Sequence, residues 1–195
     1  MVPQHRLFRK LPTVLGLFGL LLVLPGCPFS PDGGTSNKQD TRFTAERNSI
    51  EGTIDWVAQA WTQKRLPEYE QVLHTDFEFF IRDDDAEQFP WVPDGSWGRT
   101  EELDIARNMF NENFSGEERP VDTIEFNYTI TNTRNITDAQ GQVIAVEVRC
   151  DADVKVLVAS DTGWLSDTRF EFTVVEDPDE PGLYQIIEQR EKALR

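Results

Sequence analysis

The stretch Val143 to Ala159, VIAVEVRCDADVKVLVA, alternates apolar and polar side chains along nearly its whole length. Successive side chains of a strand point to opposite faces of a sheet, so this period of two predicts one strand of roughly 17 residues. Its apolar face would carry Cys150, and its other face the charged residues Glu147, Arg149, Asp151, Asp153 and Lys155. A strand well above the usual ~5–6 residues has to twist or bend strongly.

The same alternation continues on both sides of this stretch. Upstream, Ile124 to Thr131 has a period of two, and Gly141 lies in the expected turn. Downstream, Asp161-Thr162-Gly163 predicts a hairpin into a strand from Trp164 to Val175, and Leu183 to Lys192 gives the last strand. Four successive strands joined by short turns predict an antiparallel sheet.

Helical spacing dominates the residues before these strands. One stripe runs through Ala45–Lys64, and Pro67 suits the first turn of a shorter second helix. A strand follows at Phe77–Ile81, and Thr100 is the expected N-cap of a third helix, which carries Glu101 and Glu102 in its first turn. The fold class expected is α+β, with three N-terminal helices packed on a strongly curved, mainly antiparallel sheet that forms a cone.

This order of elements, with tryptophan in the first helix and long final strands, resembles the nuclear transport factor two-like (cystatin-like) fold. That fold includes ketosteroid isomerase, the polyketide-cyclase group and scytalone dehydratase. The stretch Trp97-Gly98-Arg99-Thr100-Glu101-Glu102, ahead of Met109-Phe110, is also similar to uncharacterised lipoproteins that carry such a domain. The resemblance implies a cone-shaped domain over residues 45–195, with an open mouth that can hold a small apolar ligand.

Eight aromatic side chains are candidates to line such a cone, and they serve equally well to fill it. A lined cone favours a small apolar ligand, whereas a filled cone argues against one. The eight are Trp56, Trp61, Tyr69, Phe79, Trp97, Phe110, Tyr128 and Phe170.

The N-terminus resembles the signal peptide of a bacterial lipoprotein. Basic residues at Arg6, Arg9 and Lys10 precede an apolar run that ends in Leu24-Pro25-Gly26-Cys27, which is similar to a lipobox. The resemblance implies cleavage after Gly26 and a diacylglyceryl (palmitate-type) anchor on the Cys27 thiol, which leaves residues 1–26 as signal peptide and residues 27–44 as lipidated cysteine and flexible tether. The lipid bilayer is then a partner through acylated Cys27.

This anchor predicts a place in the bacterial cell envelope. Pro28 is not the aspartate linked in some bacteria to inner-membrane retention, so the periplasmic face of the outer membrane is favoured. The alternative is an ordinary secretory signal with Cys27 incidental, in which case a Cys27–Cys150 disulfide becomes possible in principle. If Cys27 is acylated, Cys150 is a buried structural thiol.

The composition disfavours several classes of partner. The chain has 35 Asp and Glu against 19 Lys and Arg, and three of the basic but none of the acidic residues precede Cys27. Such a surface repels nucleic acid and anionic lipid. No metal or cofactor is expected, because His74 is the one histidine after the signal and Asp83-Asp84-Asp85 lacks the pattern of a calcium loop.

Weak catalytic candidates come from the resemblance alone. A ketosteroid-isomerase type of site implies a carboxylate base facing a tyrosine and a protonated acid, and Tyr69, Asp76 and Tyr128 have the right chemistry. A dehydratase implies a histidine–aspartate pair, for which His74 and Asp76 are the candidates.

The function expected is therefore non-catalytic binding of a small apolar ligand or an envelope protein. The alternative is an isomerase or dehydratase that uses a buried carboxylate, and a third hypothesis is a structural accessory of an envelope assembly. A homodimer through the sheet is a further expectation, which the charged face of the long strand weakens.

Overall fold

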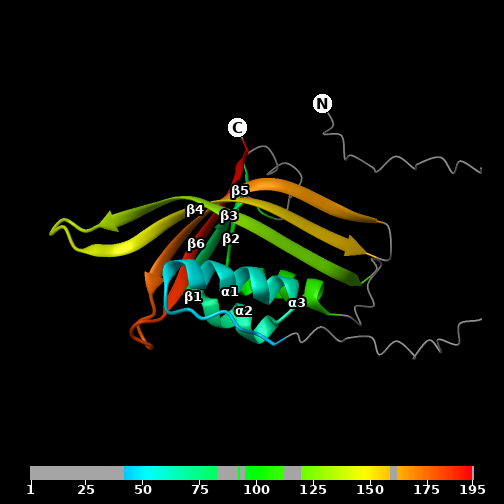
Figure 1. Cartoon of the computed structure of the whole chain (residues 1–195), viewed down its shortest axis with the longest axis horizontal. Helices are drawn as coiled ribbons and strands as arrows, with labels where there is room; N and C mark the ends of the chain where they lie inside the picture. The colour runs from blue at the N-terminus through cyan, green and yellow to red at the C-terminus, as the bar shows by residue number, and fades with distance from the viewer. Residues whose placement is uncertain (1–41, 83–91, 93–94, 112–119, 159–161, 195) are drawn as a thin grey trace, which may run out of the picture. The chain divides into compact units, whose positions relative to one another are not determined.

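A computed structural model describes residues 42–82, 92, 95–111, 120–158 and 162–194 (Figure 1). The predicted signal peptide, Cys27, the tether up to residue 41 and Asp83–Asp85 lie outside the described residues. All described residues belong to one unit, Asp40–Arg195. Within these residues, no helix combines the length and the apolar character that crossing a membrane requires.

The described residues form three helices and six strands, and these strands make one sheet in the order β2-β1-β6-β5-β4-β3. The β1–β6 pair is parallel and the other neighbours are antiparallel, so the sheet is mainly antiparallel, as predicted. The elements are α1 Ile50–Thr62, α2 Leu66–Val72, β1 Leu73–Phe80, β2 Ser96–Gly98, α3 Arg99–Phe110, β3 Val121–Thr137, β4 Val143–Val158, β5 Thr162–Glu176 and β6 Tyr184–Ala193.

The expectation of three N-terminal helices is correct for only two of them. The sequence predicts one strand, Phe77–Ile81, before the third helix, and the structure has two, β1 and β2, so α3 follows the first two strands of the sheet. Thr100 is not the N-cap of α3, because β2 pairs with β1 as far as Gly98 and the helix begins directly after it. The predicted first helix does have a side-chain cap, since Ser49 Oγ accepts the N–H of Gly52 at 3.0 Å.

The long strand predicted from its alternation is β4. Cys150 on β4 lies opposite Ile130 of β3 and Phe170 of β5, and it is fully buried. Ile144 shares the predicted apolar face but is 56 % exposed. Figure 1 shows the reason: the turn end of the β3–β4 hairpin extends beyond the helices, which leaves that part of the face uncovered.

The helices cover one face of the sheet and build the core against it. Helix α1 packs on β3 and β6, and α3 packs on β1. The outer face carries ion pairs between neighbouring strands, such as Arg149–Glu171 at 3.0 Å and Arg169–Asp151 at 2.7 Å. The most deeply buried large side chains are Ile54, Tyr69, Leu73, Ile124, Phe172 and Ile186.

A buried ion pair fastens the segment before α1 to the end of the sheet. The Arg47 guanidinium lies 3.3 Å from the Asp177 carboxylate in the β5–β6 turn, and each side chain is 5 % exposed. Arg47 also donates to the Gln71 carbonyl at 2.9 Å and lies over the Trp56 ring. This pair fixes where the chain enters the domain, at the start of α1.

Candidate functional site

A buried carboxylate joins α2, β2 and α3. Tyr69 Oη on α2 donates to Glu102 Oε1 on α3 at 2.5 Å, and the Trp97 indole Nε1 on β2 donates to Glu102 Oε2 at 2.7 Å. Tyr69 is 1 % and Glu102 3 % exposed. Both carboxylate oxygens therefore have a hydrogen-bond donor inside the core, and we call Tyr69 and Glu102 the sealed pair.

Burial governs how the sealed pair titrates. Loss of solvent raises the pKa of Glu102, and the hydrogen bonds from Tyr69 and Trp97 lower it less than burial raises it. Burial also raises the pKa of Tyr69 well above its ordinary value, and the neighbouring Glu102 carboxylate adds to the effect. Glu102 thus keeps a proton at pH values where an exposed glutamate has lost it.

Aromatic rings enclose the sealed pair. Trp61 makes edge-to-face contacts with Tyr69 at 5.5 Å and with Phe110 at 5.4 Å between ring centroids. On the other side, Trp97 stacks on Phe79 at 4.3 Å. Neither Tyr69 nor Glu102 lines an open hollow of about 460 Å³ between α1 and β3 or one of about 540 Å³ beside β1 and β2. The pair has the chemistry of an acid and a phenol, and both oxygens of the acid already have a donor.

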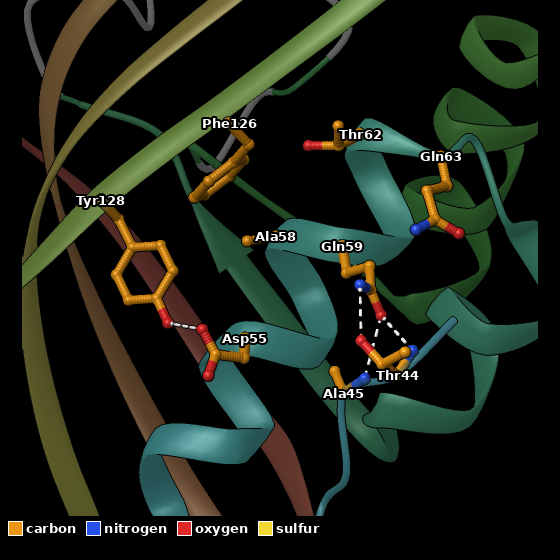
Figure 2. Close-up of a pocket in the computed structure, with 9 residues that line it drawn as sticks. All are labelled: Thr44, Ala45, Asp55, Ala58, Gln59, Thr62, Gln63, Phe126 and Tyr128. Carbon is orange, nitrogen blue, oxygen red and sulfur yellow. Dashed lines mark hydrogen bonds between the residues drawn. The ribbon is translucent and has the colours of Figure 1, made fainter. Parts of the chain in front are cut away.

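An open hollow of about 460 Å³ lies between α1 and β3 (Figure 2). Tyr128 reaches from β3 toward α1 and donates its hydroxyl hydrogen to the Asp55 carboxylate. Asp55 is exposed and Tyr128 is partly buried, so we call these two the open pair. The lining residues are Thr44, Ala45, Asp55, Ala58, Gln59, Thr62, Gln63, Phe126 and Tyr128.

One wall of this α1–β3 hollow is held in place by a single side chain. Gln59 Oε1 accepts the backbone N–H groups of Thr44 at 2.7 Å and of Ala45 at 2.9 Å (Figure 2). Since Gln59 lies on α1, these bonds fasten the incoming chain along the helix. Burial and the hydrogen bond to Asp55 raise the pKa of Tyr128, so its phenol stays protonated at neutral pH.

A second hollow, of about 540 Å³, lies beside β1, β2 and the first turn of α3. Asp76 lines this hollow, and its side chain is 82 % exposed. The neighbouring His74 accepts the Asp76 backbone N–H on Nδ1 at 3.1 Å, and the same nitrogen lies 3.9 Å from the Asp76 carboxylate.

The structure brings His74 and Asp76 together but not Tyr69, Asp76 and Tyr128. Tyr69 bonds Glu102 and Tyr128 bonds Asp55, while Asp76 lies on the surface of the second hollow. Among the described residues, no three His, Cys, Asp or Glu side chains meet in a group that could hold a metal. The catalytic assignment of Asp76, His74 and Tyr69 stays a prediction.

The eight aromatic candidates divide in a similar way. Tyr128 lines the α1–β3 hollow and Trp97 lines the second one, whereas the other six line neither. Tyr69, Phe110 and Phe170 are core residues, at 1 %, 8 % and 8 % exposure. Trp56 donates its indole N–H to the Glu68 carbonyl at 2.6 Å and packs edge-on against Phe43 at 4.6 Å. The pocket-lining role of these aromatic residues stays a prediction.

Sequence reasoning missed Glu102 and Asp55. The sequence predicts Glu102 only as an acidic residue of the first turn, yet it lies on the buried stripe of α3 with Ala106, four residues later. That spacing was the available signal. Asp55 has no such signal, because it lies on the polar side of α1 and acquires Tyr128 only through the packing of α1 on β3.

Solved structures with this arrangement support the fold. A candidate aromatic ring hydroxylase from Novosphingobium aromaticivorans superposes with a TM-score of 0.52 at 11 % identity, covering 77 % of this chain and 90 % of its own. A candidate scytalone dehydratase from the same organism gives 0.51 at 10 % identity, covering 75 % and 82 %. A conserved protein from Planctomyces limnophilus gives 0.52 at 12 % identity, covering 72 % and 90 %.

These likenesses show a nuclear transport factor two-like, cystatin-like fold, and at 10–12 % identity they bear on the fold alone. No family model and no curated protein matches the sequence. The fold expected from the order of elements is thus confirmed.

Proposed function

We propose that this protein is a non-catalytic ligand-binding lipoprotein, held at a bacterial envelope membrane through diacylglyceryl-Cys27. One observation carries the binding role: the α1–β3 hollow is open, and its polar groups surround space of about 460 Å³. Pockets that take small molecules have about 300–1,000 Å³ and a few well-placed polar groups. The ligand-binding face of the domain is then the cleft between its first helix and the edge strand β3.

The sealed pair supports the absence of chemistry. A catalytic carboxylate has to reach a proton on a bound substrate within hydrogen-bond distance. Both oxygens of Glu102 already have donors, and the rings of Trp61, Phe79 and Phe110 fill the surroundings. The pair therefore stabilises the packing of α2 against α3.

The anchor rests on the sequence Leu24-Pro25-Gly26-Cys27 and its basic, apolar approach. Two acyl chains hold a protein stably on a bilayer, whereas one chain does so only marginally.

Native mass spectrometry of the full chain extracted from membranes tests both halves of the proposal. We expect a mass that begins at an acylated Cys27, together with a released small molecule. With Cys27→Ser, the protein should remain unprocessed and lose its lipid mass. An unacylated chain would overturn the anchor, and a bound protein in place of a small molecule would overturn the ligand-binding role.

A variant whose larger side chain fills the α1–β3 hollow tests where the ligand binds. Thr62 is exposed on α1 and lines the hollow, so Thr62→Trp should occupy the space without disturbing the core. We expect the released molecule to disappear. Thr100→Trp, at an exposed position beside the second hollow, is the matched control and should leave the ligand bound. Loss of the ligand with Thr100→Trp but not with Thr62→Trp would place the binding site in the second hollow.

A second candidate function keeps the alternative of a ketosteroid-isomerase type of enzyme. It is favoured by one observation, a buried carboxyl with a raised pKa hydrogen-bonded to a tyrosine. It requires that Trp97 swing away from Glu102 to admit substrate. The test is conversion of 3-cyclohexenone to its conjugated isomer, followed by absorbance, with Glu102→Gln against Asp104→Asn on the exposed side of α3. Activity that is lost with Glu102→Gln alone would establish this function.

A further inference from the structure

The lining of the α1–β3 hollow selects for charge as well as for size. We propose that the hollow binds an organic ammonium group, carried on a small aromatic or alkyl ligand, between the Phe126 and Tyr128 rings and the Asp55 carboxylate. The inference rests on the proposed function and names the class of ligand for the same site.

Two rings of the edge strand form a corner above α1. Phe126 and Tyr128 are two residues apart on β3, so both point to the helix-covered face. Their centroids are 6.4 Å apart and their planes meet at 70°. Phe126 is fixed from behind by Phe170, with centroids at 5.9 Å and planes within 20°. Aromatic faces attract a cation that lies within about 6 Å of the ring, and rings set at an angle can both do so.

Asp55 supplies a negative charge at the foot of this corner. One carboxylate oxygen accepts the Tyr128 hydroxyl, and within the described part of the chain the other oxygen has no hydrogen-bond donor and no ion pair. Figure 2 shows the carboxylate beside the hydroxyl end of Tyr128. An ammonium N–H is the partner that this unused acceptor lacks.

The remaining charges of the site point to the same class of ligand. None of the nine lining residues is a lysine or an arginine. The neighbouring Lys64 directs its ammonium to the Val121 carbonyl at 2.9 Å. Glu51, one turn before Asp55 on α1, adds negative potential at Tyr128. A carboxylate or phosphate ligand would meet this field unfavourably, whereas an ammonium is stabilised by it.

The hydrogen bond between the open pair also prepares the site. Tyr128 holds the Asp55 carboxylate in one position before any ligand arrives, and Gln59 holds the opposite wall. Groups that are already ordered cost less conformational entropy on binding. The lining is thus preorganised for a cation of modest size.

The test compares benzylammonium with benzyl alcohol, which has the same ring without the charge. Both are titrated into the full-length protein in a nonionic detergent, and binding is followed by saturation-transfer NMR of the ligand. We expect benzylammonium to bind about tenfold more tightly than benzyl alcohol. Asp55→Asn keeps an acceptor for Tyr128 but removes the charge, and it should abolish this preference.

A matched variant separates the local charge from the charge of the whole chain. Asp153→Asn changes the net charge equally, from an exposed position on the outer face of β4, and should preserve the preference for benzylammonium. Phe126→Leu should weaken benzylammonium binding about threefold, since it removes one face of the corner.

The outcomes distinguish the inference from the proposed function. Equal binding of the two probes, both displaced by Thr62→Trp, would overturn the ammonium assignment and leave the binding function standing. Equal losses with Asp55→Asn and Asp153→Asn would also overturn the assignment, because the effect would then come from overall charge. No binding of either probe, together with an empty protein in native mass spectrometry, would overturn both.

Discussion

The domain contains the same hydrogen bond twice, from a tyrosine to a carboxylate, in two opposite settings. The sealed pair, Tyr69 and Glu102, lies in the core with Trp97 as a second donor. The open pair, Tyr128 and Asp55, lies at the mouth of a hollow with one carboxylate oxygen unused. The same two functional groups therefore have different roles, because solvent and neighbouring residues determine which oxygen atoms can still accept a hydrogen bond.

The difference teaches where function can lie in this fold. In the sealed pair every polar atom is satisfied inside the protein, so its contribution is stability and a unique packing of α2 and α3. In the open pair water satisfies what the protein does not, and a ligand can replace that water. Substitutions that change one group of either pair test this difference.

Truncation of the carboxylates should give the largest contrast. Glu102→Ala leaves a cavity and removes the acceptor of the buried Tyr69 hydroxyl and of the partly buried Trp97 N–H, so we expect the free energy of unfolding to fall by about 3 kcal/mol. Asp55→Ala removes an exposed group and should cost less than about 0.5 kcal/mol. Urea unfolding measures the free energy of unfolding of both variants. Equal losses of stability would contradict the distinction between a sealed pair and an open pair.

Removal of one donor should have an intermediate effect. Trp97→Phe keeps the ring that stacks on Phe79 but leaves Glu102 Oε2 without its donor, at an expected cost of about 1–3 kcal/mol. Tyr128→Phe leaves Asp55 to water and should cost about 1 kcal/mol or less. Thermal unfolding followed by circular dichroism compares the two variants. A larger fall in melting temperature for Tyr128→Phe than for Trp97→Phe would contradict the larger contribution that we assign to the sealed pair.

The pH dependence of stability should distinguish the pairs next. The pKa of Glu102 is raised in the folded state, so the folded protein binds this proton more tightly than the unfolded chain. Its contribution to stability is complete below the ordinary glutamate pKa and is lost as the pH rises through the folded pKa. Glu102→Gln, which can donate to Tyr69 and accept from Trp97, should remove this loss.

The measurement is the difference in free energy of unfolding between wild type and Glu102→Gln, determined at about pH 4 and about pH 8. We expect Glu102→Gln to gain relative to wild type at the higher pH. Asp55→Asn, from the exposed open pair, is the matched control. A constant difference between the two pH values would mean that Glu102 ionises normally.

The smallest effect concerns the titration of Tyr128. Burial, then the hydrogen bond and charge of Asp55, raise its pKa. Asp55→Asn removes the charge, so the pKa of Tyr128 should move down toward its ordinary value while that of Tyr69 stays high. NMR of ¹³C-labelled tyrosine follows each of the three tyrosines separately. No change at Tyr128 would show that burial alone sets its pKa.

The pattern of side chains predicted most of the elements but not how they are connected in space. The period of two placed β3, β4, β5 and β6, and the helical stripe placed α1, because both patterns are local properties of the chain. The three-residue β2 was missed, since so short a strand forms only by pairing with β1. The parallel β1–β6 pair was missed for the same reason: it joins segments more than 100 residues apart.

By itself, then, the sequence determined an α+β domain with long antiparallel strands, an acidic composition, and an N-terminal stretch similar to a lipobox. Only the tertiary structure decided which carboxylates matter. Glu102 looks like any first-turn glutamate and Asp55 like any exposed helical aspartate until packing sets a tyrosine beside each. The spacing of Glu102 and Ala106 indicates a shared helix face, but the hydrogen-bond partners of both carboxylates come from residues distant in sequence.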